Sequence, residues 1–305
     1  GGSRRRCRVR KVDRVVQRVW LVDGVVGALL VLGGGTLIIL GLGAGFPSAK
    51  VVLPVLVVSA LCVGCLERLL PYEPDWNRSH DDALTDGVHY VVNFSLKQGS
   101  LMLYAVLVGK LSFGTWWPSG WPFGLQVVLC LGIIDLFLYL VHRWSHHNEI
   151  LWSFHAIHHS SKRLYWVNGE KRHPVHQLLE GMPGVTVVML LGAPHQVVVG
   201  ALAILGINMM LQHGNIDYRA GWLRFVFCVA ELHRWHHQQE ADRSKVNFGA
   251  FFAVWDLLFN TYRSHSGHLT SNEVGIETET NFPSAYTEQL RWPFKKRPLF
   301  TENLK

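Results

Sequence analysis

Charged residues are scarce in this chain. Asp, Glu, Lys and Arg make up 17% of its 305 residues, whereas hydrophobic residues make up 49%. Soluble domains average about 25% charged residues, so this composition argues against an ordinary soluble protein and favours several membrane spans. The net charge of +7 is concentrated in the opening segment, 1–19, and in RWPFKKRP near the end, and no nucleic-acid-binding module accompanies it. We therefore expect no nucleic-acid partner, and we take the basic N-terminal segment as cytoplasmic.

Cysteine is also rare, and the common zinc motifs are absent. The five cysteines are scattered, and the pair Cys62 and Cys65 lies inside an apolar run, where small buried side chains are expected. This distribution excludes a disulfide framework and a cysteine-rich structural zinc site. The sequence contains no H-E-x-x-H run, which excludes the usual zinc protease motif.

Long apolar runs are present instead. Four segments, at about 20–46, 51–66, 83–111 and 125–141, predict membrane-spanning helices. A fifth apolar stretch, 183–211, is interrupted at Gly192–His195, which predicts a re-entrant hairpin with two short arms. The sequence thus predicts an all-α, multi-pass membrane protein with one embedded domain at 20–262. A basic segment at 1–19 and a polar tail at 263–305 would flank it.

Histidines crowd into the stretch 140–160, directly after the fourth apolar segment. His142 and His146 form H-x-x-x-H, and two H-x-x-H-H sets follow. These sets are His155, His158 and His159, and further along the chain His233, His236 and His237. On a helix, positions i, i+3 and i+4 share a face, and imidazole binds iron, copper, nickel and zinc. Eight imidazoles are too many for one ion, so the spacing predicts two metal ions.

The position of the histidines favours catalysis over transport. A metal transporter would place its ligands in mid-span with carboxylates, whereas these histidines follow the span among polar residues. Haem histidines would stand singly on separate helices. Four spans return the chain to its starting side, which predicts a cytoplasmic helical cap that carries the histidines. A two-iron centre with nitrogen ligands fits best, and a non-catalytic metal-binding or metal-transport protein is the alternative.

These three histidine motifs, in this order and spacing, resemble the fatty acid hydroxylase/sterol desaturase superfamily of membrane di-iron enzymes. The likeness extends to DLFLYLVHRWSHH before the first motif and to NFGAFFAVWDLLFNTY after the last one. The residues that carry it there are Asp135, Tyr139, His142 and Arg143, and Asn247, Gly249, Trp255, Asp256 and Tyr262. The resemblance covers about 125–262.

The resemblance implies a set of site residues. The implied metal ligands are His142, His146, His155, His158, His159, His173, His213, His233, His236 and His237. For His173 and His213, hydrogen bonding to a ligand is the alternative role. Asp135, Tyr139 and Asp256 are the implied catalytic or ligand-orienting residues, with an ion pair or a helix cap as the alternative for the two carboxylates. His147 is expected at the surface, and His176 occupies a position where many relatives carry a carboxylate.

The resemblance also implies an activity and its partners. The expected cofactor is two iron ions, with zinc able to substitute in purified protein. Dioxygen would be used to hydroxylate or desaturate a C–H bond of a lipid that enters from the bilayer, along the apolar segments 20–111 and 183–212. The sequence contains no haem module, flavin fingerprint or ferredoxin cysteine set, so a separate reductase and electron carrier are expected.

Overall fold

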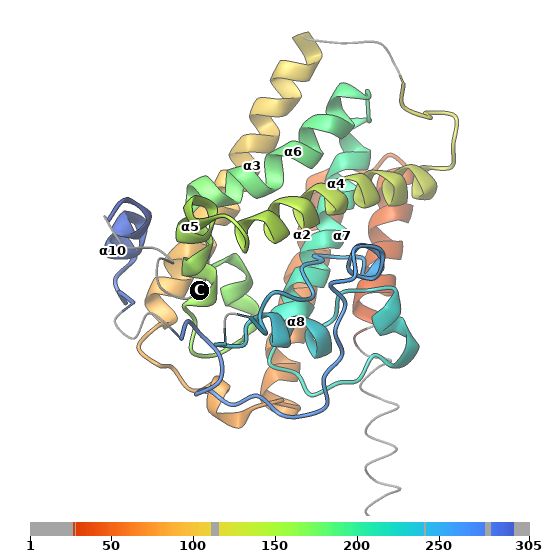
Figure 1. The fold of residues 1–305 in the computed structure, drawn as a ribbon. Helices are drawn as coiled ribbons and strands as arrows, with labels where there is room; N and C mark the ends of the chain where they lie inside the picture. The colour runs from red at the N-terminus through yellow and green to blue at the C-terminus, as the bar shows by residue number, and fades with distance from the viewer. Residues whose placement is uncertain (1–26, 28, 111–115, 241, 278–281, 296–305) are drawn as a thin grey trace, which may run out of the picture.

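The computed structural model describes residues 27, 29–110, 116–240, 242–277 and 282–295 (Figure 1). Apart from an apolar helix at Leu29–Gly43, its longer helices are α2 (Ser48–Leu69), α3 (Ala83–Lys110), α4 (Phe123–Ser145), α5 (Glu149–His159), α6 (Pro174–Leu190) and α7 (His195–His213). Shorter ones are η1 (Pro74–Asn77), η2 (Trp166–Glu170), η3 (Gly221–Phe225), α8 (Ala230–His236), α9 (Val254–Leu258), α10 (Tyr286–Arg291) and η4 (Trp292–Phe294). The described part has no β-strand, only isolated bridges, which confirms the predicted all-α class.

Three of these helices are long and apolar enough to cross a membrane. They are α2, α4 and α7, with 22, 23 and 19 residues. The helix Leu29–Gly43 is apolar but shorter, and the first residues of the predicted span 20–46 lie outside the described part, as does the basic segment 1–19. These helices make the chain an integral membrane protein.

The predicted span at 83–111 forms one helix, α3, which is 28 residues long but not apolar enough to be a candidate span. Its first half carries polar side chains that are fully buried in protein. His89 Nδ1 lies 3.1 Å from the carbonyl oxygen of Arg172, and Asn93 Nδ2 donates to the same oxygen at 2.9 Å. This half of α3 therefore packs against the polar part of the protein, and the predicted number of crossings stays a prediction.

The apolar stretch 183–211 contains the predicted break. Helices α6 and α7 are separated at residues 191–194, where Gly192 has a φ of +86° that suits glycine. Both arms are longer than the sequence suggested, and α7 has the length and composition of a full span. The start of α6 was missed because His176, Gln177 and Glu180 look like loop residues, although all three side chains point into the protein.

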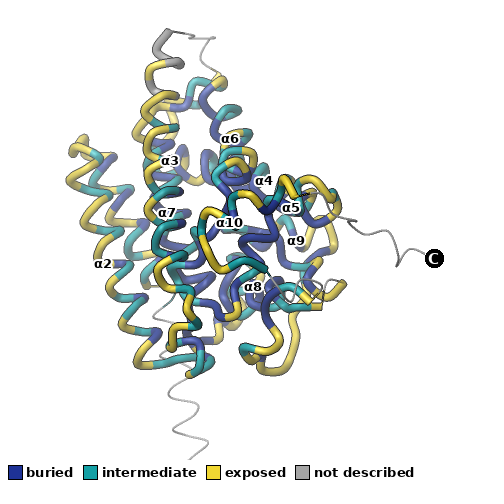
Figure 2. Tube along the Cα trace, turned by 90° about the vertical axis from the view of Figure 1, so that its left-hand side faces the viewer, coloured by how far each residue is buried: buried dark blue, intermediate teal, exposed yellow. Residues whose placement is uncertain are grey.

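The core is built by α4, α6 and α7. In α7, 67% of the candidate span is buried, compared with 11% in α2, so α7 is central and α2 is peripheral. Figure 2 shows this contrast as exposed residues along α2 and buried ones in the interior. A Cβ atom at Gly184 of α6 would lie 2.8 Å from the Ile134 Cα of α4, so only glycine permits this close approach.

The remaining elements form a polar cap at one end of the helices. It contains α5, α8 and α9, and the C-terminal segment packs onto it. In α10, the Gln289 Oε1 atom lies 2.8 Å from His89 Nε2 of α3, and the Phe294 ring contacts Phe154 of α5 edge to face. The C-terminal segment thus contacts both α3 and the cap helix α5.

Candidate metal centre

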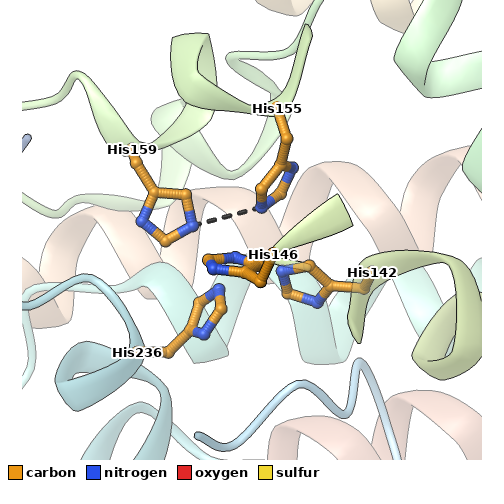
Figure 3. A group of neighbouring side chains, drawn as sticks. All are labelled: His142, His146, His155, His159 and His236. Carbon is orange, nitrogen blue, oxygen red and sulfur yellow. Dashed lines mark hydrogen bonds between the residues drawn. The ribbon is translucent and has the colours of Figure 1, made fainter. Parts of the chain in front are cut away.

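Two adjacent groups of buried histidines lie in the cap. The first group contains His142, His146, His155, His159 and His236, and the second contains His158, His213, His233 and His237. Within each group, one ring nitrogen per residue lies within 4.8 Å of all the others. Figure 3 shows the first group, whose rings come from α4 and the residue after it, from α5 and from α8, and point toward one another.

The two H-x-x-H-H motifs are divided between the groups in opposite ways. On α5, His155 and His159 contribute to the first group, whereas His158 contributes to the second. On α8 and the residue after it, only His236 joins the first group. Each motif therefore spans both groups, which ties the two sites into one centre.

The nitrogen positions fit two metal ions. In the second group, the Nε2 atoms of His213 and His158 are 3.2 Å apart, and those of His233 and His213 are 3.1 Å apart. Two nitrogens bound at right angles to one ion, each at about 2.1 Å, would lie about 3.0 Å apart. Such spacing is that of ligands that share an ion.

Unpaired nitrogen atoms support the same conclusion. Within the described part of the chain, three rings of the first group have a buried Nε2 atom without a hydrogen-bond partner, namely those of His142, His146 and His236, whereas the unpaired atom of His155, His158 and His233 is Nδ1. A buried polar atom without a partner costs about 1–3 kcal/mol. A metal ion in the first group would satisfy these three Nε2 atoms, and together with the Nε2 spacing in the second group this makes the residues present fit a two-metal centre.

Burial also keeps these imidazoles in the form that binds metals. Desolvation, followed by the charges of neighbouring histidines, holds the pKa of His155, His159 and His237 well below the ordinary value. Their rings are therefore neutral near pH 7, and their lone pairs are free for metal ions.

Backbone carbonyls fix the orientation of several rings. His142 Nδ1 lies 2.8 Å from the Phe248 carbonyl oxygen, and His236 Nδ1 lies 2.9 Å from that of Val246. A carbonyl can only accept, so each Nδ1 carries the hydrogen and each Nε2 faces the group. The segment 246–248 thus holds one ligand candidate from α4 and one from α8.

Asp135 accepts hydrogen bonds from the residues that follow this segment, at 251–255. Its carboxylate is fully buried and takes the backbone N–H groups of Phe251 and Phe252 at 2.8 Å and the Trp255 Nε1–H at 2.9 Å. It does not pair with Arg143, whose guanidinium lies over the Phe259 ring. Asp135 lies outside both histidine groups and anchors the loop to α4.

Asp256 contacts the segment 246–248 directly, and Tyr139 contacts Asp256 through Thr261. Asp256 accepts the Phe248 N–H at 2.9 Å and the Thr261 hydroxyl at 2.7 Å. The Thr261 hydroxyl in turn lies 2.8 Å from the Tyr139 hydroxyl, which therefore acts as the donor. Because the Phe248 carbonyl holds His142, Asp256 reaches the first group through the backbone. Neither Asp256 nor Tyr139 lies in a histidine group.

The remaining histidines take other positions. His173 caps α6 by accepting the Val175 N–H at 3.1 Å, and the structure does not bring it into either group. His176 is buried beside the first group, with its ring 4.7 Å from that of His155 and its Nε2 atom 2.9 Å from Ser145 Oγ. His147 is exposed.

A cavity of about 340 Å³ leads to both groups. Among its lining residues are His142 of the first group and His233 of the second. Elsewhere its walls are mostly apolar and include Val52, Leu56, Phe94, Leu101, Met182 and Leu202. These come from α2, α3, α6 and α7. Within the described chain, α2 and α3 contact other elements more than each other, and residues of both line the cavity.

Sequence reasoning missed two aspects of this site. The Phe248 and Val246 carbonyls are main-chain atoms, so residue identity carries no signal for them. The second aspect is a set of charged residues on the cavity wall, at 97, 170, 172 and 180. A sequence signal for these existed, because the run Glu170, Lys171, Arg172 is strongly charged within a chain that is poor in charge.

Comparisons with known proteins agree with this centre. The fatty acid hydroxylase family model matches residues 127–261. Ornithine lipid hydroxylase OlsE of Rhizobium tropici is 32% identical over 244 residues, which cover 77% of this chain and 73% of the relative. Alkylglycerol monooxygenase of Caenorhabditis elegans is 26% identical over 54% of this chain and 31% of its own length. Methylsterol monooxygenase 1 of Danio rerio is 27% identical over 50% of this chain and 53% of its own length.

No solved structure matches the chain. The match to OlsE nevertheless covers most of both proteins, and the family match includes the segment from α4 to the end of the loop that orients His142. The histidine groups, the apolar helices and these matches confirm the resemblance seen in the sequence. The chain belongs to the fatty acid hydroxylase family of membrane oxidoreductases.

Proposed function

We propose that the chain uses two iron ions and dioxygen to hydroxylate a lipid. The observation that carries this proposal is the cavity, which connects apolar helices with a histidine of each group. An alkyl chain can enter such a cavity directly from a bilayer, where it is already free of water. Because a relative is an ornithine lipid hydroxylase, a membrane lipid of that kind is our first candidate substrate.

We assign the metal ligands from the two groups. Five histidines would hold one ion and four the other, which leaves His173 as the cap of α6. Bound iron supplies the chemistry that side chains lack, namely the reduction of dioxygen and the oxidation of an unactivated C–H bond. All-nitrogen ligation suits iron, and zinc would occupy the same sites without redox chemistry.

The protein's own part is to position the substrate and exclude water. The apolar walls would hold the alkyl chain, and the buried rings would keep both ions at fixed places. One oxygen atom would enter the C–H bond and the other would leave as water, with two electrons and two protons from outside. We propose that a separate reductase and electron carrier supply these electrons.

A product analysis tests the activity. Iron-loaded protein, a chemical reductant, dioxygen and a bacterial lipid extract should yield a lipid heavier by one oxygen atom, or one lighter by two hydrogens if desaturation occurs. Mass spectrometry distinguishes these products. Full loading with two irons per chain, without any product from lipid classes that include sterols and alkylglycerols, would favour a metal-binding role instead.

A narrower cavity should slow the reaction. Gly206 of α7 lines the cavity, and a Cβ atom there would meet only Leu56 Cδ2, at 3.8 Å. The larger side chain of Gly206→Leu would occupy substrate space, and we expect turnover to fall about tenfold or more at unchanged metal content. Gly132→Leu is the control, because Gly132 lies in α4 with nothing within 4 Å. Equal turnover in both variants would argue against this path.

We also propose a cytoplasmic position for the metal centre. The cap would then lie on the same side as the basic N-terminal segment. In a variant that lacks the five native cysteines, a single cysteine placed at exposed His147 and, in a second variant, one placed within 1–19 should react from the same side of sealed vesicles. Labelling from opposite sides would show that the number of crossings between them is odd.

A further inference from the structure

Two ion pairs line the mostly apolar cavity. Lys97 of α3 pairs with Glu170 at the end of η2, and Arg172 pairs with Glu180 of α6. The Arg172 and Glu180 side chains are only 8% and 3% exposed. Buried ionisable groups are costly even when they are paired, and in membrane proteins they usually mark a functional site.

The backbone holds these charged side chains on the cavity wall. Glu170 at the end of η2 and Arg172 two residues later line the cavity, whereas Lys171 between them pairs with Asp86 at 2.9 Å. Asn93 Nδ2 donates to the carbonyl oxygens of both Glu170 and Arg172, at 2.8 and 2.9 Å. The two charged side chains are therefore held at fixed places rather than on a mobile loop.

The cavity lining also contains an uncharged side chain that can accept a hydrogen bond. Gln212 of α7 lines the cavity, and its Oε1 atom has no hydrogen-bond partner among the described residues, while its Nε2 donates to the Gly249 carbonyl. A buried acceptor without a partner points to a donor supplied by a ligand. Gln212 precedes His213, and a Cβ atom at Gly169 would lie 3.0 Å from His213 Nδ1, so the wall borders the second histidine group.

We propose that this polar wall, formed by Lys97, Glu170, Arg172, Glu180 and Gln212, binds the zwitterionic end of a lipid, so that the carbon that is oxidised lies near the lipid's polar group. The inference rests on the proposed function and names its substrate class. Two cations and two anions balance, which suits a ligand that carries both an ammonium and an acidic group. A neutral sterol or an alkyl terminus would leave these groups without new partners.

Binding measurements test the wall without any reaction. The probes are radiolabelled N-palmitoyl-lysine, which carries an ammonium and a carboxylate, and hexadecanol, which has the same chain length and no charge. The double variant Lys97→Met/Glu170→Gln removes both charges and so leaves no unpaired buried ion. We expect it to bind N-palmitoyl-lysine about tenfold more weakly, which corresponds to about 1.4 kcal/mol, at unchanged hexadecanol affinity, because the charged partners of the polar end are removed.

Two further variants make the result interpretable. Arg172→Met/Glu180→Gln should show the same selective loss and replaces the first variant if that one does not fold. Arg291→Met/Glu288→Gln removes an exposed pair on α10, outside the cavity, and should leave both affinities unchanged. An equal change for both probes in the wall variants would overturn the proposal.

The position of the new oxygen provides the second test. With the iron-loaded enzyme and N-palmitoyl-lysine, tandem mass spectrometry should place the oxygen in the amino-acid part or on the adjacent carbons. Oxygen on the distal methylenes would overturn this inference and leave the proposed function intact. Selective binding without any oxygenated lipid would support the polar wall and contradict the proposed function.

Discussion

Replacing His236 with alanine should abolish lipid oxidation and lower the metal content from two ions to one per chain. His236 is the only member of the first group that α8 supplies, and its Nε2 atom has no partner within the described protein. When one residue of a catalytic unit is removed, turnover typically falls at least about a thousandfold. Iron content after chelator dialysis and product formation by mass spectrometry check the two expectations.

The adjacent residue provides a sharper version of this experiment. His237 belongs to the second group, so His237→Ala should also lose one ion, but the one that His236→Ala retains. Spectra of the two singly loaded variants should therefore differ. His147→Ala is the control, because His147 is exposed and lies outside both groups, and it should keep two ions and full turnover. Retention of both ions in His236→Ala would refute the ligand assignment.

The histidine motifs were readable from the sequence because their spacing is local. Helical geometry alone places i, i+3 and i+4 on one face, so the clustering of His155, His158 and His159 needed no tertiary information. Their division between two groups did need it, since the side on which His158 lies depends on where α7 and α8 pack. His173 shows the same limit, because its sequence context resembles the family although its ring caps a helix.

For the fold, the sequence likewise predicted the helices but not what surrounds each of them. Apolar runs identified the helices, since burial in lipid or protein requires the same hydrophobic residues. The runs could not distinguish lipid from protein as the neighbour, and α7 illustrates this, because a stretch expected to dip into the bilayer is the buried centre of the bundle. Glu180 lies in a stretch that was expected to be polar and Asp86 in a predicted membrane span, yet both are buried in protein and face ionic partners.

The second prediction with a large expected effect concerns Asp256 of α9, which accepts hydrogen bonds from the segment that follows α8. Asp256→Ala should destabilise the protein and weaken the first metal site while the second site keeps its ion. The Asp256 carboxylate is buried and accepts the N–H groups of Phe248 and Gly249 and the Thr261 hydroxyl, at 2.9, 2.9 and 2.7 Å. Each donor left unsatisfied costs about 1–3 kcal/mol, so we expect a loss of about 3–5 kcal/mol and a Tm lower by several degrees.

The expected loss of metal affinity at the first site follows from the connection between Asp256 and His142 through the Phe248 peptide. Without the carboxylate, the Phe248 peptide can turn, and its carbonyl no longer holds His142 at 2.8 Å. Loss of a residue that orients a ligand typically lowers metal affinity about 10–100-fold, and here only the first group depends on Phe248. Metal titration of Asp256→Ala should thus show one weakened and one unchanged site. Asp242→Ala removes an exposed carboxylate paired with Lys245 and serves as the control. Equal weakening of both sites would mean that Asp256 supports the cap as a whole rather than His142.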